Sequence, residues 1–118
     1  MHIERLVIDS IYLIALYLLR RFARAEFEED VASLPPNSND PRLSFDAKTA
    51  TVVCDSVSQH PMELSFHRIY KNPYGEYFLV MSDGPRPYVC HLSKVRAMNA
   101  LRHDREAFVR EFGAENAR

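Results

Sequence analysis

The clearest structural signal in the chain is Met62-Glu63-Leu64-Ser65-Phe66-His67-Arg68-Ile69-Tyr70-Lys71-Asn72-Pro73-Tyr74-Gly75-Glu76-Tyr77-Phe78-Leu79-Val80-Met81. Two runs rich in aromatic and β-branched residues flank Asn-Pro-Tyr-Gly, and this arrangement predicts a β-hairpin. Pro73 presets φ for the first corner of a type I turn, and Gly75 accepts a positive φ at its exit. The hairpin indicates an antiparallel sheet but carries no recognisable chemistry.

Further strands are expected on both sides of the hairpin. Leu43–Val57 predicts a strand with a bend at Asp46-Ala47, followed by a turn at Gln59–Pro61. After the hairpin, Ser82–Pro87 predicts a second turn and Tyr88–Leu92 a short strand. Pro85 and Pro87 place that strand at an edge, because proline cannot donate to a ladder of hydrogen bonds. We expect a sheet of three to four strands.

Two short helices are expected after the sheet. Ser93 is placed to cap a helix from Lys94 to about Arg102, and Asp104 to cap a helix over Arg105–Phe112. Gly113 follows as a stop signal, and the tail over 114–118 is expected to fray.

One long helix is predicted at the N-terminus, from Ile3 to about Ala32. Arg24 and Glu28 are four residues apart in it and are expected to pair across one turn. From Ile11 to Leu19 every residue is apolar or aromatic, and this segment is called the belt below. Apolar residues three or four apart mark one helix face: Ile3, Val7, Ile11, Ile14, Leu18 and Phe22.

The belt allows three interpretations. A transmembrane span needs about twenty apolar residues, and Asp9 interrupts the extension backwards. A helix lying in a membrane surface needs one strongly polar face, which the belt lacks. We favour a helix covered by its own sheet and by a second copy or another protein. The residues expected to self-associate are Ile11, Leu13, Ile14, Tyr17 and Leu18.

The predicted organisation has three parts in one α+β fold. The apolar helix occupies residues 1–32, a linker with three prolines occupies residues 33–42, and the α+β domain occupies residues 43–118. The linker is expected to let the helix swing relative to the domain. At 118 residues, the chain is long enough for a single modest core.

Composition excludes some classes of protein and disfavours others. The apolar fraction of 47% is ordinary for a globular protein. Fifteen basic and sixteen acidic residues leave no surplus of either charge, so we expect neither a non-specific nucleic-acid binder nor a DNA mimic.

Cys54 and Cys90 are expected to be reduced thiols. With no evident signal peptide, the expected location is the cytoplasm.

Catalytic and metal sites find little support in the sequence. Cys90 and His91 are adjacent in a predicted strand, so they point to opposite faces and do not easily share a metal. Cys54 with His67 or His91 is a conceivable nucleophile–base pair, but no glycine-rich elbow or oxyanion loop accompanies it. We expect no enzyme, no metal and no cofactor.

The hairpin aromatics are candidates for contact with a partner. Aromatic side chains with cations beside them anchor protein partners or stack on bases, although the simpler interpretation is cross-strand and core packing. Tyr77 and Phe78 point to opposite faces, so one is expected inside and the other is available for presentation. Because the chain has no basic surplus, a protein partner is favoured. The expected contact residues are Arg68, Lys71, Tyr74, Tyr77 and Arg86.

One alternative function comes from the C-terminal third. A strand over Tyr88–Leu92 followed by two helices has the element order of a ribbon-helix-helix DNA-binding dimer. Tyr88, Val89 and Cys90 are poor readers of base edges, which disfavours this alternative. A nucleic-acid-binding regulator of this kind would use Lys94, Arg96, Arg102 and Arg105.

From Leu43 to Gly113 the chain resembles small α+β accessory proteins carried by phages and plasmids. The resemblance is carried by Phe66–Lys71, Tyr74–Leu79 and the closing Glu111-Phe112-Gly113. It implies the context of a mobile element, in which antitoxins and inhibitors of host defence, anti-CRISPR proteins included, are common. We therefore expect a non-catalytic protein-binding module that acts as an inhibitor or antitoxin-like partner.

Overall fold

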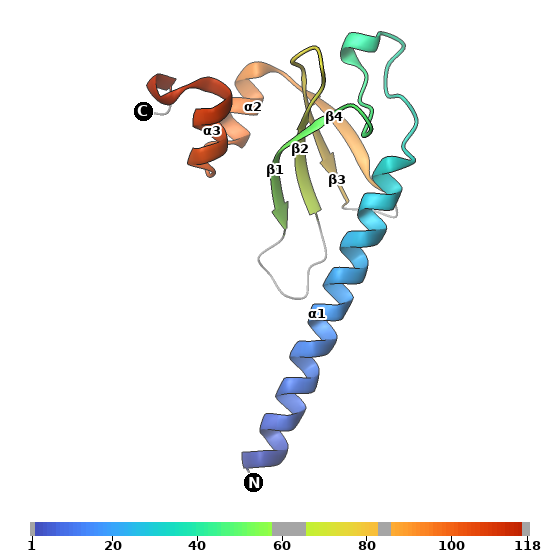
Figure 1. Cartoon of the computed structure of the whole chain (residues 1–118), viewed down its shortest axis with the longest axis vertical. Helices are drawn as coiled ribbons and strands as arrows, with labels where there is room; N and C mark the ends of the chain where they lie inside the picture. The colour runs from blue at the N-terminus through green and yellow to red at the C-terminus, as the bar shows by residue number, and fades with distance from the viewer. Residues whose placement is uncertain (1, 58–65, 83–85, 117–118) are drawn as a thin grey trace.

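The computed structural model describes residues 2–57, 66–82 and 86–116 of the chain (Figure 1). One long N-terminal helix is followed by a four-stranded antiparallel sheet and two short helices, which confirms the α+β expectation. The expected turn at Gln59–Pro61 and the Asp83–Pro85 part of the second turn lie outside the described residues.

The sheet is built from consecutive antiparallel strands in the order β1-β2-β3-β4. The strands are β1 (Thr51–Val57), β2 (Phe66–Lys71), β3 (Tyr77–Met81) and β4 (Tyr88–Leu92). The predicted hairpin is confirmed as β2 and β3, with Lys71 opposite Tyr77 and Tyr70 opposite Phe78. β4 has the predicted bounds and is an edge strand, as expected.

The hairpin turn is held by Asn72 as well as by its glycine. Gly75 has φ 86°, the positive value expected for the turn exit. The buried Asn72 carboxamide oxygen accepts hydrogen bonds from the N–H groups of Tyr74 and Glu76, at 3.0 and 2.8 Å. Its amide group donates to the carbonyl of Arg42 at 2.8 Å, which ties the hairpin tip to the linker.

The strand expected from Leu43 is wrong in its first half, since β1 begins only at Thr51. Pro41–Leu43 forms a short 3-10 helix instead. Asp46 then organises a turn, because its side chain accepts from the N–H of Lys48 and its carbonyl accepts from Thr49 and Ala50. Such local hydrogen bonds compete with the ladder of a strand.

The two C-terminal helices follow their predicted caps. α2 (Lys94–Ala100) is capped by the Ser93 hydroxyl, and α3 (Arg105–Phe112) by the Asp104 carboxylate. Gly113, with φ 90°, ends α3 as expected. The tail expected to fray instead begins with a 3-10 turn over Ala114–Asn116, and the Asn116 amide donates to the carbonyl of Phe112.

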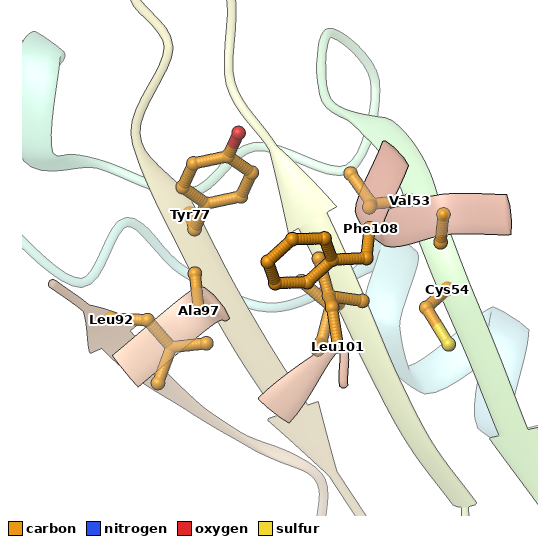
Figure 2. Packing of buried hydrophobic residues seen from close by; sticks show 9 residues of the cluster. Val53, Cys54, Tyr77, Leu92, Ala97, Leu101 and Phe108 are labelled. Carbon is orange, nitrogen blue, oxygen red and sulfur yellow. The ribbon is translucent and has the colours of Figure 1, made fainter. Parts of the chain in front are cut away.

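α2 and α3 cover one face of the sheet (Figure 1). Ala97 and Leu101 come from α2 and the residue that follows it, and Phe108 comes from α3. Figure 2 shows their side chains gathered over the strands. The strand residues of this cluster are Val53, Cys54, Ile69, Tyr77 and Leu92.

The opposite face is covered by the end of α1 (His2–Ala32) and by the segment that follows it. Phe27 and Val31 of α1 and Phe45 from the segment before β1 are buried there. The sheet contributes Phe66, Tyr70, Phe78 and Val80. Because both faces are covered, Tyr77 and Phe78 are both buried, and the expectation that one of them is presented is wrong.

Candidate interaction surface

α1 is attached to the sheet by its last turns. The Phe27 ring stacks on the Phe66 ring of β2, with ring centroids 5.2 Å apart. Val31, one turn further on, is 2% exposed. These side chains belong to the core of the α+β domain, so the last turns of the predicted 1–32 segment are not separate from that domain, and the expectation that the linker lets the helix swing is wrong.

A buried arginine strengthens this attachment. Arg68 of β2 lies under α1, with its guanidinium 5.3 Å from the centroid of the Phe27 ring. One of its terminal nitrogens donates to Asp55 of β1 at 3.0 Å and to Glu28 of α1 at 3.2 Å. The other donates to the Tyr70 hydroxyl at 3.0 Å.

The same group of charges extends further along α1. Arg24 donates to the Asp55 carboxylate, and it also forms the predicted ion pair with Glu28, at 3.9 Å. Burial alone would lower the pKa of Arg68, but the hydrogen bonds to Asp55 and Tyr70 outweigh that effect and raise the pKa. Arg68 therefore stays charged and joins α1, β1 and β2.

The N-terminal part of α1 extends beyond the sheet (Figure 1). Eleven of its large apolar side chains are between 51% and 69% exposed, which is unusual for so many neighbouring residues, whereas Leu16 is half-buried. The belt therefore does not cover the sheet, and that part of the sequence-based interpretation is wrong. The exposed residues are Leu6, Val7, Ile8, Ile11, Tyr12, Leu13, Ile14, Tyr17, Leu18, Leu19 and Phe22.

All five residues expected to self-associate are in this exposed set. Over the described residues, no helix combines the length and the apolar character that crossing a bilayer requires. Ile11, Ile14 and Leu18 lie on one side of α1, while Leu13 and Tyr17 lie toward another. The exposed surface is thus wider than one narrow stripe.

The apolar stripe of α1 points away from the sheet. Leu18 and Phe27 are nine residues apart, which is about two and a half helical turns, so their side chains leave the helix in opposite directions. Because Phe27 faces the core, the side of α1 that carries Leu18 and Ile11 faces solvent. Attachment and exposure therefore belong to different segments of α1: the last turns pack on the sheet, and the N-terminal part is exposed.

The residues expected to contact a partner from the hairpin are divided by the structure. Arg68 is 6% exposed and Tyr77 is 7% exposed, so neither is part of an accessible surface. Burial, together with a 3.0 Å hydrogen bond to Glu111, raises the pKa of Tyr77. Lys71 is half-buried and pairs with the same Glu111 at 3.2 Å.

Tyr74 and Arg86 remain exposed, with Tyr74 at the hairpin tip. A shallow cleft lies beside Tyr74, where the tip meets the segment between α1 and β1. Its lining residues are Ser38, Asn39, Pro41, Ser44, Asp46, Thr49, Pro73 and Tyr74.

The candidate chemical groups lie apart from this cleft. Cys54 and Cys90 are free thiols, as expected, and the buried Cys54 contacts the Asp104 carboxylate at 3.6 Å. A hydrogen bond from the N–H of Ala107 lowers the pKa of Asp104, and the Cys54 thiol adds a smaller effect. Within the described residues, no group of three or more His, Cys, Asp or Glu side chains is placed to hold a metal ion.

The basic residues of the nucleic-acid alternative are exposed on the C-terminal helices. Lys94, Arg96, Arg102 and Arg105 all lie at the surface of this region. However, the strand that precedes them is the outermost strand of a four-stranded sheet rather than half of a separate two-stranded ribbon.

Sequence reasoning missed the residues that hold α1 in place. Phe27, Arg68 and Asp55 are far apart in the chain, and no local pattern links them. The available signal was an arginine between aromatic residues of a strand, which indicates a buried charge only when the covering element is known.

No protein-family model, no curated protein and no solved structure matches the chain.

Proposed function

We propose that this protein is a non-catalytic protein-binding module that acts as an inhibitor or antitoxin-like partner of another protein. The observation that carries the proposal is the row of exposed apolar side chains on α1, 51–69% exposed on a helix fixed to the core at its other end. Contiguous apolar surface of this extent marks an interaction site in a folded protein.

The way α1 is attached supports binding in a defined orientation. The Phe27 and Val31 contacts and the Arg68 ion pairs hold the last turns of the helix against the sheet. The last turns of the helix are therefore fixed before it meets a partner, so the exposed part leaves the domain in a defined direction and less conformational entropy is lost on binding. A flexible tail would not have this advantage.

The hairpin tip provides a second surface for the target protein. Tyr74 is 61% exposed beside a shallow cleft, and the turn below it is fixed by Asn72. A tyrosine on a rigid turn contributes a large contact area at low entropic cost. We assign target contact to Tyr74 and Arg86, and leave out the buried Arg68 and Tyr77.

The experiment is site-specific photocrosslinking in the organism that makes the protein. A photoreactive phenylalanine analogue is placed at Ile14 on α1 or at Tyr74 on the hairpin tip. Val95 provides the matched control, because it is an apolar residue on a helix and is 67% exposed. The proposal predicts an adduct with a different protein from Ile14, Tyr74 or both, and none of that mass from Val95.

Two results would contradict the proposal. One is the absence of adducts with a different protein from both Ile14 and Tyr74 after irradiation. The other is that the chain crosslinks only to itself from both positions.

A further inference from the structure

We infer that the stripe of α1 that faces away from the sheet binds a second copy of this chain, with the two helices antiparallel. The inference rests on the proposal that α1 is a protein-binding surface, and it names the occupant of one side of it. It leaves the hairpin tip for the target protein.

The stripe has the spacing of a coiled-coil seam. Its residues alternate at intervals of three and four, which keeps them on one side of the helix over two heptads. The seam begins with an acidic residue, continues with four apolar residues and ends with a basic residue. In chain order these are Glu4, Val7, Ile11, Ile14, Leu18 and Arg21.

The charges at the two ends select the antiparallel orientation. Two such helices can pack antiparallel, with the points between Tyr12 and Leu13 of each chain opposite one another. Glu4 of each chain then lies beside Arg21 of the other chain. A parallel pair would instead place Glu4 on Glu4 and Arg21 on Arg21, and like charges at this range repel. The layers of the antiparallel seam are Glu4 with Arg21, Val7 with Leu18, and Ile11 with Ile14, each occurring twice by symmetry.

The length of the exposed segment fits this register. From Glu4 to Arg21 the seam is about 26 Å long at 1.5 Å per residue. The first residue of α1, His2, would lie opposite Ala23 of the other chain, and Ala23 is where α1 begins to pack against its own sheet. The partner helix would therefore span the exposed part of α1 and end where the covered part begins.

The antiparallel seam also keeps the two sheets apart. Each sheet is attached at the C-terminal end of its own α1, and Figure 1 shows the N-terminus at the far end of the molecule. The apolar residues of the seam face away from Phe27, so the partner helix lies on the side of α1 opposite the sheet, and only Arg21, at the end of the seam, borders a hollow beside Phe66. Leu6, Leu13 and Tyr17 lie off this seam and stay available to another protein.

The test is a charge-reversal cycle measured on the purified full-length chain by sedimentation velocity across a dilution series. Glu4→Arg and Arg21→Glu each convert both end contacts from attractive to repulsive. We expect each variant to raise the dimer dissociation constant about tenfold. The double variant restores opposite charges at both ends and is expected to return close to the wild-type value.

Matched controls separate the seam from a general effect of charge. Asp9→Arg and Arg5→Glu make the same charge changes close by on α1, but both positions lie off the seam. They are expected to leave the dissociation constant within about twofold of wild type. Circular dichroism checks that every variant keeps its helix content.

The outcomes are distinct. A wild-type chain that sediments as a monomer overturns the inference, and so does a double variant that remains as weak as the single ones. Single variants as tight as wild type contradict the antiparallel order, because a parallel pair already has like charges together. If the purified chain is a monomer but Ile14 crosslinks to a different protein, the proposed function stands and only this inference fails.

Discussion

Arg68 is the residue whose environment most affects how α1 is held. It is a charged side chain on an apolar face, buried between the Phe27 ring and Tyr70. Two carboxylates, from Asp55 and Glu28, neutralise it from different elements. A buried charge is tolerated only with such partners, since its desolvation is otherwise very costly.

The two carboxylates should differ in their effect on stability. Asp55→Asn removes the charge nearest to the buried guanidinium and is expected to lower the free energy of unfolding by about 2–3 kcal/mol. Glu28→Gln changes a side chain that is 55% exposed and should cost less than about 1 kcal/mol. Urea denaturation of both variants at one protein concentration measures the difference. Equal losses would contradict this ranking.

Asp104 is expected to make stability depend on pH. Its carboxylate accepts a hydrogen bond from the Ala107 N–H at 3.1 Å, and this bond lowers its pKa. A carboxyl group with a lower pKa in the folded state stabilises the fold at neutral pH, and that contribution is lost as the pH falls below about 4.

Asp104→Ala should therefore lower the free energy of unfolding by about 1 kcal/mol at pH 7, the usual effect of losing an N-cap. The deficit relative to wild type should shrink when unfolding is measured at progressively lower pH, because the wild-type carboxylate is then protonated. A deficit that stays constant down to pH 2 would show that the charge of Asp104 contributes nothing.

At the scale of the element, α1 has a covered end and an exposed end. Phe27 is 3% exposed and stacks on Phe66, whereas Phe22, little more than one turn earlier, is 69% exposed. The same residue type is thus a core residue at position 27 and an exposed surface residue at position 22 of one helix. Its position relative to the sheet decides which role it has.

This difference gives a matched pair of substitutions. Phe27→Ala should lower the free energy of unfolding by about 3 kcal/mol, because it removes a ring from the core and leaves a cavity. Phe22→Ala should change the stability of the monomer fold by less than about 0.5 kcal/mol. Denaturation at a protein concentration low enough to dissociate oligomers provides the comparison. A large loss from Phe22→Ala would mean that the exposed part of α1 belongs to the core.

At the scale of the whole molecule, the sequence predicts the local elements well. The hairpin, the edge strand and the caps at Ser93 and Asp104 follow from turn and capping residues that act over a few positions. The long helix follows from the periodicity of its apolar residues. These signals are local, so no knowledge of the tertiary structure is needed.

The covering of the sheet could not be predicted in the same way. The alternation of Tyr77 and Phe78 predicts one inward and one outward side chain only if one face is open, and here helices cover both faces. The belt similarly indicates an apolar surface without indicating what lies against it. Contacts such as Phe27 with Phe66 join residues far apart in the chain, and no pattern in the sequence specifies them.

The most direct test of the claim that α1 holds two chains together is the molar mass of the purified full-length protein by light scattering. We expect twice the chain mass of 13.7 kDa for wild type and 13.7 kDa for Ile14→Asp, with unchanged helix content. Val95→Asp, a charge placed on another exposed apolar side chain, should leave the mass at the wild-type value. A wild-type mass of 13.7 kDa, or an Ile14→Asp variant that keeps twice that mass, would show that α1 does not hold two chains together.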